Sequence, residues 1–443
     1  AQVPHGAVRL PVEVGVRTAG IMHGGVPLGE ADGHVGRLPT SVRGAVAGSF
    51  VAGHPGKERS WVMMPQPYSG PKHASAEQLC DVVALSSRVF DADMGAEFPL
   101  LFDAERLDQL LIYDLDGVPV SLVGMTLDDT SLLGCPVRVA CIGSVCTDPA
   151  HRGAGLAGRL MDAAVTQAVA GGAAIMLISG GRSLYTRRGA FPEGRFPGYD
   201  IPGPSLPAVD SSIVLEPVSD ETVGSVCRLF ESEPIRFRRD PLDYRRRVGC
   251  GVMVCSPAAT YGVRRAGELV AALSVNLPAK SEGALVVREM AGSRAAILAA
   301  LAHLVRLHPA ASVTVETYAS DYGMRDVCQL LGVSPRWESF PGTVKVLDVR
   351  RLWSDFAPLL AERIGAGNYE AIRVWAEADE LRVHRLVFEL GNETVEVDGD
   401  RSVVATLFGS VHSEPLAGMG GHLAGLLRQA LPLPLPRYGL NFV

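Results

Sequence analysis

The sequence predicts a mixed α/β protein in which two similar units follow one another and a smaller α+β unit comes last. The order helix, hairpin, strand, helix, strand occurs twice, first after Ser75 and again after Ser211, which indicates a tandem structural repeat. The length of 443 residues allows two to four domains at roughly 100–200 residues per domain. Hydrophobic residues make up 47% and charged residues 20%, so the chain is globular rather than disordered or fibrous.

The first unit begins with an amphipathic helix. Ser75 is a candidate N-cap, and apolar residues then recur at spacings of three and four as far as Phe90. Two β-like segments, 110–113 and 118–125, flank Asp116-Gly117, a dipeptide that favours a tight hairpin turn. The unit is predicted to end with a strand over 137–145, a helix over 155–170, a strand over 173–179 and one or two helical turns over 184–188.

The second unit repeats this order, and a third unit begins near Phe340-Pro341-Gly342. In the second unit the predicted elements are a helix over 222–230, a hairpin of segments 260–263 and 269–275, a strand over 284–290, a helix over 295–307 and a strand over 311–317. In the third unit they are a strand over 344–349, a helix over 351–364, strands over 381–389 and 393–397, and helices over 403–409 and 421–430.

These patterns divide the chain into four predicted segments: 1–72, 73–208, 209–342 and 343–443. Segment 1–72 shows no sustained period and is expected to be an extended or partly disordered arm. Residues 431–443 contain alternating prolines, which exclude a helix and favour an extended tail.

Charge and composition argue against several classes of function. The formal net charge is −7 and aromatic residues make up only 6%, so no nucleic-acid partner is expected. The arginines between Arg236 and Arg247 are interpreted as a solvated face or a subunit contact. No run of about 18 apolar residues occurs, and the start of the chain lacks a signal-peptide pattern. The eight cysteines include no Cys-x-x-Cys pair, so we expect no metal site and reduced cysteines in a cytoplasmic protein.

The segment from Ser144 to Leu160 is the most informative part of the sequence. It passes from a strand through a short loop into a helix, and Arg152, Gly155 and Ala157 follow the spacing Arg-x-x-Gly-x-Ala. Gly153 and Gly155 lack a Cβ, so backbone amides at the helix N-terminus can approach a ligand and bind a pyrophosphate. The alternative is an ordinary glycine-rich turn. The loop is neither a Walker A motif nor a Rossmann fingerprint.

A second motif further along the chain, Tyr185-x-x-x-Gly189, makes this segment resemble the coenzyme A loop of the GNAT acetyltransferase superfamily. The resemblance implies a GNAT fold for residues 75–205 and acetyl-CoA as co-substrate. It also implies that Tyr185 acts as the general acid that protonates the departing thiolate, although a packing tyrosine is the alternative. By the same resemblance the coenzyme is held by Val145, Cys146, Thr147, Arg152, Gly153, Ala154, Gly155, Leu156, Ala157 and Gly158.

The order of the three units resembles the enhanced-intracellular-survival (Eis-like) family of acetyltransferases. This implies tandem GNAT folds with mixed central sheets, followed by a small domain that looks like a sterol carrier protein. In that family the terminal carboxylate acts as the base, so the α-carboxylate of Val443 is the candidate here; the alternative is a tail packed on its own unit, with water as the base. The Arg-x-x-Gly-x-Ala spacing is missing over 290–297, so the second unit is expected to bind no coenzyme. Ala190 stands after Gly189, where the family often has an aromatic residue.

The resulting functional hypothesis is an N-acetyltransferase that works by direct attack in a ternary complex. The expected acceptor is a primary amine on a small polycation or a protein lysine. Asp91, Asp93, Glu97 and Asp103 could attract such an amine, or they are ordinary surface acids. The alternative function is a non-catalytic GNAT scaffold that binds an apolar ligand through its sterol-carrier-like domain. Relatives form hexamers, so a homo-oligomer is expected.

Overall fold

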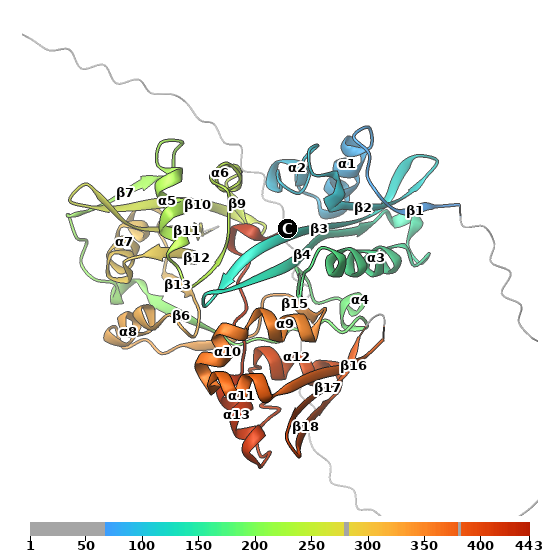
Figure 1. The fold of residues 1–443 in the computed structure, drawn as a ribbon. Helices are drawn as coiled ribbons and strands as arrows, with labels where there is room; N and C mark the ends of the chain where they lie inside the picture. The colour runs from blue at the N-terminus through green and yellow to red at the C-terminus, as the bar shows by residue number, and fades with distance from the viewer. Residues whose placement is uncertain (1–66, 279–282, 380–381) are drawn as a thin grey trace, which may run out of the picture. The chain divides into compact units, whose positions relative to one another are not determined.

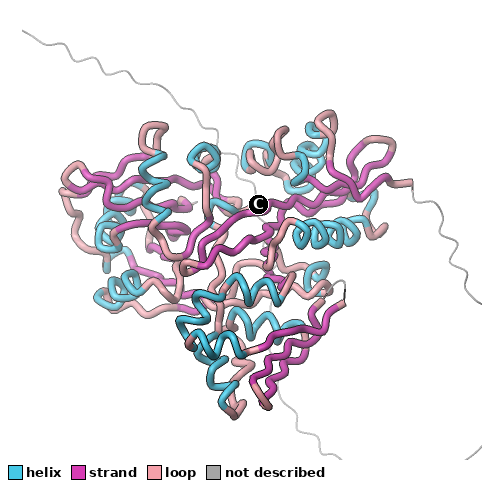
Figure 2. Tube along the Cα trace, in the orientation of Figure 1, coloured by secondary structure: helices cyan, strands magenta, loops and turns pink. Residues whose placement is uncertain are grey.

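The computed structural model describes residues 67–443 except 279–282 and 380–381. Residues 1–66, which make up most of the predicted arm, and Leu381, which begins a predicted strand, lie outside the described residues. Within the described part of the chain, the strands form three sheets and the helices pack on their faces (Figures 1 and 2). No helix in these residues is both long and apolar enough to span a membrane.

The first sheet has seven strands in the order β1-β2-β3-β4-β5-β15, with β8 paired beside β3. β4 and β5 are parallel, and the other neighbours are antiparallel, so the sheet is mixed as predicted. The strands are β1 (Ser69–His73), β2 (Leu110–Leu115), β3 (Val118–Leu132), β4 (Cys135–Thr147), β5 (Ile175–Ile178), β8 (Ile235–Phe237) and β15 (Thr343–Val346).

Helices cover both faces of this sheet (Figure 1). Side chains alternate along a strand, so Ile112 belongs to the core that contains α1 (Leu79–Phe90), whereas its neighbour Leu111 belongs to the core that contains α3 (Leu156–Ala170). The short helices of this unit are α2 (Met94–Glu97), α4 (Ser183–Thr186), and the 3₁₀ turns η1 (Leu107–Gln109), η2 (Pro149–His151) and η3 (Gly203–Ser205).

The second sheet has eight strands in the order β14-β6-β13-β12-β11-β10-β7, with β9 beside β10. β12 and β13 are its parallel pair. The strands are β6 (Phe196–Pro202), β7 (Ile213–Pro217), β9 (Val252–Met253), β10 (Ser256–Arg265), β11 (Glu268–Asn276), β12 (Ala284–Gly292), β13 (Ser312–Glu316) and β14 (Arg336–Glu338). One core of this unit contains α7 (Arg294–Leu307) and α8 (Tyr322–Leu330), and a separate core contains α5 (Val223–Glu231) and α6 (Pro241–Gly249).

The sheets exchange strands across the predicted unit boundaries. β6 comes from segment 73–208 but lies between β13 and β14, and β15 comes from segment 343–443 but pairs with β5. β1 begins at Ser69, inside the predicted arm, and pairs with β2. The predicted boundaries follow proline- and glycine-rich linkers, and strand pairing crosses these linkers. The predicted class, mixed α/β with two mixed sheets and a third α+β unit, is confirmed.

The third unit is a three-stranded antiparallel sheet covered by helices. Leu386 and Phe388 are fully buried, and the Phe388 ring lies 5.5 Å from Trp353, so the face of this sheet is closely packed. The predicted single helix over 351–364 is wrong, because it is interrupted at Phe356, just before Pro358. The elements are α9 (Val349–Asp355), α10 (Ala357–Ile364), α11 (Ala366–Ala371), β16 (Arg373–Ala378), β17 (Val383–Leu390), β18 (Glu393–Asp398), α12 (Asp400–Phe408) and α13 (His422–Ala430).

The tail after α13 leaves its own unit. Its prolines keep it extended, and Leu433 still donates a backbone hydrogen bond to Leu407. The tail then runs past β13 and β12, turns through η4 (Gly439–Asn441) and ends at Val443 beside β4. The expected alternative, a tail packed only on its own unit, is therefore wrong.

Candidate active site

The first sheet opens into a fork between its two parallel strands. β4 and β5 pair from Val139 and Ile175 as far as Ile142 and Ile178, and the amide of Ser179 then donates to the Ile142 carbonyl at 3.0 Å. β4 continues to Thr147 and stays paired with β3 alone among the described strands. One edge of β4 over residues 143–147 is therefore free of a strand partner in the described part of the chain, and its amides can bind a ligand.

A bulge in β4 lies at the mouth of this fork. Between Gly143 and Cys146 the strand has one residue more than β3, and Ser144 takes the left-handed φ of 51°. Such a backbone is uncommon for a residue with a side chain and tends to occur at functional sites. The Ser144 hydroxyl is buried and has no hydrogen-bond partner among the described residues. The bulge redirects the backbone just before Val145, Cys146 and Thr147, three of the residues predicted to hold the coenzyme.

The predicted pyrophosphate loop follows directly. Asp148 accepts a hydrogen bond from the amide of Ala150 at 3.0 Å and so starts η2. Gly153 and Gly155 take φ values of 84° and 76°, which side chains disfavour, so glycine is required there by the backbone rather than by lack of space. Gly155 is the N-cap of α3 and offers no side chain to its first amides, so these amides are available to an anion.

The predicted coenzyme residues lie together at this fork and loop. Val145 and Cys146 are buried in β4, and Thr147 at the end of β4 is partly buried. Arg152, Gly153 and Gly155 are exposed, and Leu156 anchors the start of α3 in the core. Ala154, Ala157 and Gly158 are partly buried between them. Burial raises the pKa of the Cys146 thiol to about 12, so this cysteine is not a nucleophile at neutral pH.

Tyr185 lies in α4, which follows β5. It is 5% exposed and belongs to the same hydrophobic cluster as Val145 of β4 and Leu156 of α3. A Cβ on Gly180 would lie 3.1 Å from the ring, so the backbone approaches the tyrosine closely. Burial raises the pKa of Tyr185, and the charge of Arg182 opposes the shift only in part. Its hydroxyl therefore keeps its proton at neutral pH and can donate it.

Val443 fills the inner end of the fork. The main-chain carboxyl group packs directly on Gly143, where any Cβ would overlap its carbon and oxygen. The hydroxyl of Ser179, just after β5, donates to the Val443 carbonyl oxygen at 2.9 Å. Gly143 of β4 and Ser179, which follows β5, thus contact the same main-chain group of Val443. This residue is 5% exposed. The sequence did not identify Gly143 and Ser179, because neither belongs to a motif.

A polar cluster holds the tail in this position. The amide of Leu440 donates to Glu289 at 2.8 Å, and its carbonyl accepts from Arg247 at 2.8 Å. Asn441 accepts from Arg239 at 2.6 Å and donates to Asp128 at 2.9 Å. We call the four holding side chains the tail clamp: Asp128, Arg239, Arg247 and Glu289.

The tail clamp corrects the interpretation of the arginine-rich segment. Arg239 is buried and paired with Glu289 at 2.5 Å, and Arg247 is buried near Asp128, so these two arginines do not form a solvated face. Arg246 likewise reaches Asp103 in the first unit at 2.6 Å. The partners lie 50 residues apart for Arg239 and Glu289 and 143 residues apart for Arg246 and Asp103, so charge patterning alone could not reveal these contacts.

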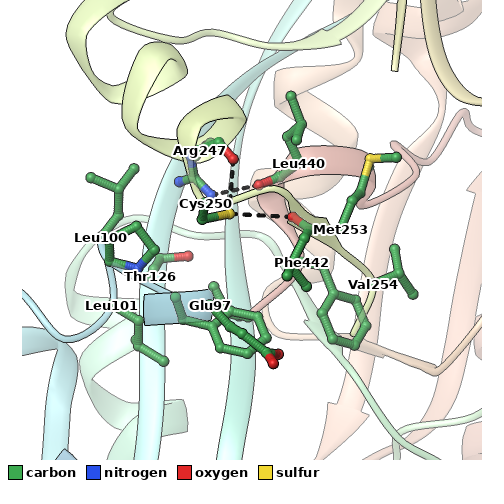
Figure 3. A pocket seen from close by; sticks show the side chains of 15 residues that line it. Glu97, Leu100, Leu101, Thr126, Arg247, Cys250, Met253, Val254, Leu440 and Phe442 are labelled. Atoms are coloured by element: carbon green, nitrogen blue, oxygen red, sulfur yellow. Dashed lines mark hydrogen bonds between the residues drawn. The ribbon is translucent and has the colours of Figure 1, made fainter. Parts of the chain in front are cut away.

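A small pocket of about 30 Å³ adjoins the end of the tail (Figure 3). Its lining comes from residues 97–101 and Thr126 of the first unit, from residues between 247 and 254 of the second, and from the tail between 439 and 443. Of the four acidic residues considered as amine attractors, Glu97 lies in the lining, whereas Asp93 caps α2 and Asp103 binds Arg246. Burial, with the charge of Asp93, raises the pKa of the Glu97 carboxyl.

The opening beyond the second parallel pair, β12 and β13, contains charged side chains. β12 and β13 pair as far as Val287 and Val315, and Arg288 then forms an ion pair with Glu316 across the opening. At the start of α7 the amide of Gly292 donates to Glu233 at 2.8 Å. Arg294 pairs with the same Glu233 at 2.6 Å. In the second unit a side-chain carboxylate, that of Glu233, thus lies just before the start of α7.

Comparison with known proteins identifies the first unit. Residues 71–191 match the sequence profile of the family described as the Acetyltransferase (GNAT) domain. No curated protein matches the chain in sequence.

Several solved structures share the fold. A GCN5-related N-acetyltransferase from Anabaena variabilis has 13% sequence identity and a TM-score of 0.57 over 84% of this chain and 98% of that chain. The corresponding protein from Kribbella flavida has 16% identity and a TM-score of 0.56 over 83% and 98%. Eis1 from Mycobacterium abscessus has 14% identity and a TM-score of 0.51 over 82% and 97%. At these identities the likeness concerns the fold, and the general activity that the matched domain supports is acyl transfer from an acyl-CoA. Residues 71–191 are therefore similar to the acetyltransferase domain of the GNAT family.

Proposed function

We propose that the protein is an acetyl-CoA-dependent N-acetyltransferase that acetylates a primary amine by direct attack in a ternary complex. One observation supports the proposal: the carbonyl group of Val443 lies on Gly143 and Ser179 where β4 and β5 separate, and the open edge of β4 leads from there to the glycine loop before α3. Tyr185 follows β5 and shares a hydrophobic cluster with Val145 of that edge. The acceptor expected from the sequence is a small polycationic amine or a protein lysine.

The residues present fit acetyl-CoA. The uncapped amides of α3 and the exposed Arg152 suit its pyrophosphate, and the amides of residues 145–147 suit its pantetheine arm and thioester. Acetyl-CoA supplies an activated acetyl group on a thiol. The same β4 amides are donors for the negative charge that develops on the carbonyl oxygen during attack.

Two groups of the chain move protons in this proposal. The substrate ammonium gives one proton to the carboxylate of Val443, and the neutral amine then forms the new C–N bond. The C–S bond breaks as the Tyr185 hydroxyl gives a proton to the sulfur, and the second proton leaving the acylated nitrogen restores the Tyr185 hydroxyl. The role of Val443 requires a free carboxylate at this residue. Ser179 and Gly143 hold that group inside the fork.

The decisive experiment combines binding and turnover. Calorimetry should detect acetyl-CoA binding, and free-thiol release should follow on addition of primary amines. A folded protein that gives no heat with millimolar acetyl-CoA and no thiol with any amine contradicts the proposal. The alternative, a lipid-binding scaffold, receives no support from the third unit, where Leu386 and Phe388 fill the face of the sheet.

The proposal also includes an Eis-like organisation with a sterol-carrier-like third unit, a cytoplasmic location and assembly into a homo-oligomer. The fold shared with Eis1 from Mycobacterium abscessus supports the first of these. Light scattering coupled to size-exclusion chromatography measures the assembly state.

A further inference from the structure

We infer that a larger cavity, separate from the fork, binds a small amphipathic anion: a molecule with an apolar body and one acidic head. The cavity has a volume of about 360 Å³, within the range of about 300–1,000 Å³ that is usual for small-molecule sites. None of the residues assigned to the coenzyme or to proton transfer lines it, so this inference is independent of the proposed function.

The cavity lies where the three units meet (Figure 1). The first unit contributes Leu133, in the turn between β3 and β4, and the second contributes residues between 318 and 322, after β13. The third unit contributes Arg363 of α10 and Phe408 of α12, and the tail adds residues 431–435. Because all three units form its walls, the cavity exists only in the whole chain.

Most of the lining is apolar. Its buried apolar side chains are those of Phe196, Ile235, Phe408, Leu431, Leu433 and Leu435. The prolines of the tail keep residues 432–435 extended, so at about 3.1 Å per residue they follow about 10 Å of the wall. An apolar body of similar length is removed from water along this wall, which favours its binding.

The charged residues of the lining are two arginines, and no aspartate or glutamate lines the cavity in the described part of the chain. Arg195 is exposed and lies over the ring of Trp337 at 4.4 Å, without a hydrogen bond or ion pair within the described residues. Arg363 is partly buried and donates to the main-chain carbonyls of Ala430 at 2.5 Å and Pro432 at 2.8 Å. It too has no ion pair with a described carboxylate, so the positive charge of the lining is not neutralised there.

Both arginines border the same residue of the tail, Pro432. Arg363 donates to its carbonyl, and a Cβ on Gly409 would lie 3.3 Å from the Pro432 side chain and 3.6 Å from the Cβ of Arg195. Burial lowers the pKa of Arg363, because its charge loses hydration, and a bound anion would reverse this shift. The acidic head is therefore assigned to the Pro432 end and the apolar body to the wall that leads to Leu435.

Both parts of the ligand are needed to satisfy this lining. A neutral apolar molecule would cover the two guanidinium groups without giving either of them an acceptor, and a cation would be repelled by both. A small hydrophilic anion would pair with the arginines but would leave the apolar wall in contact with water. An amphipathic anion meets both requirements.

The test is calorimetry of the 443-residue chain with octanoate, whose extended chain has a length similar to that of the wall, and with 1-octanol, its uncharged counterpart. We expect octanoate to bind about 10- to 100-fold more tightly than octanol, the range for a hydrogen bond to a charged group. Equal affinities, or no binding of octanoate, overturn the inference.

Arg195→Gln is the variant that tests the acidic head. The side chain is exposed and makes no hydrogen bond within the described residues, so the fold should tolerate its replacement. The affinity for octanoate should fall by about tenfold and that for octanol should stay the same. Arg306→Gln, at an exposed arginine of α7 outside the lining, is the matched control and should change neither affinity.

Ala319→Trp tests the location. Ala319 is an exposed residue of the lining, so the larger side chain can fill the cavity without entering a core. Binding of both octanoate and octanol should be lost, while circular dichroism verifies folding. Octanoate binding that persists in folded Ala319→Trp, or that is unchanged in Arg195→Gln, overturns the inference. N-acetyl transfer is measured separately by thiol release, so the failure of one proposal leaves the other intact.

Discussion

The two parallel strand pairs of this protein open in the same way and are filled differently. Beyond Ile142 the β4–β5 fork holds the end of the tail, bound by Ser179. Beyond Val287 the β12–β13 fork holds the ion pair of Arg288 with Glu316, and Arg437 of the tail pairs with the same glutamate at 2.7 Å. The same strand topology thus produces an opening in both sheets. The side chains that line each opening determine whether a ligand can enter it.

The helix that follows each fork shows the same contrast. The start of α3 has an exposed arginine and uncapped amides, whereas the start of α7 is capped by Ser293 and binds Glu233. An internal carboxylate at a helix N-terminus satisfies the amides and the dipole that would otherwise attract a phosphate. In the second unit Arg239 and Glu289 hold the tail, whereas the first unit presents uncapped amides at the start of α3.

The largest effect is expected for Gly143→Ala. The added Cβ overlaps the carboxyl group of Val443, so the tail must leave the first fork and turnover should fall by about 10³-fold if Val443 is the base. Gly181→Ala is the matched control, because a Cβ there meets nothing within 4 Å. Thiol release measures turnover, and circular dichroism verifies folding. Retained activity in folded Gly143→Ala would remove Val443 from the mechanism.

Tyr185→Phe should lower turnover by about 10²-fold, because it removes the proton donor without altering the packing of the ring. Tyr322→Phe is the counterpart in the second unit. Tyr322 opens the helix after β13 and is 60% exposed, so its variant should match the unaltered protein. If thiol release falls equally in both variants, the loss in Tyr185→Phe does not come from a missing proton donor at the first fork.

Arg152→Gln should weaken acetyl-CoA binding by about tenfold, as expected for one lost charged contact to a phosphate. Arg294→Gln should leave coenzyme affinity unchanged and destabilise the fold by about 3–5 kcal/mol, because it leaves Glu233 buried without its partner. Calorimetry and denaturant titration measure the two quantities. Weaker coenzyme binding in Arg294→Gln would place a coenzyme site in the second unit as well.

The smallest expected effect is in the alkaline pH dependence of turnover. Burial raises the pKa of Tyr185 above the usual value of 10, so the hydroxyl stays protonated and competent as an acid up to that pH. The rate should therefore change less than about twofold between pH 8 and 10 and fall only above the tyrosine pKa. A rate that falls well below pH 10 in the unaltered protein but not in Tyr185→Phe would contradict the shift.

The sequence could predict the parts of the site that are local motifs. The loop from Arg152 to Gly158 and Tyr185 each lie within a short segment whose glycines or spacing carry the signal. The destination of the tail was expected from the family resemblance, and its contact with Gly143 was not. Ser179 and Val443 are 264 residues apart, and no local pattern links them.

Features that depend on long-range pairing were missed for the same reason. The tail clamp joins Asp128, Arg239 and Glu289 from three distant parts of the chain. The break at Phe356 was missed because the apolar periodicity continues through this residue. Pro358, two residues later, is a local signal for such a break. The lining of the pocket likewise exists only after the units have packed together.

The exchange of strands has a practical consequence for dissecting this protein. A fragment ending at residue 208 would carry β6 without β13 and would leave β5 without β15, so both would present bare hydrogen-bonding edges. Bare edges recruit other chains, so such a fragment should precipitate or swap strands with its copies. Separate expression of residues 73–208 is thus a poor route to an active catalyst. Insertions that the protein tolerates should be rare in the connections on either side of β6 and β15.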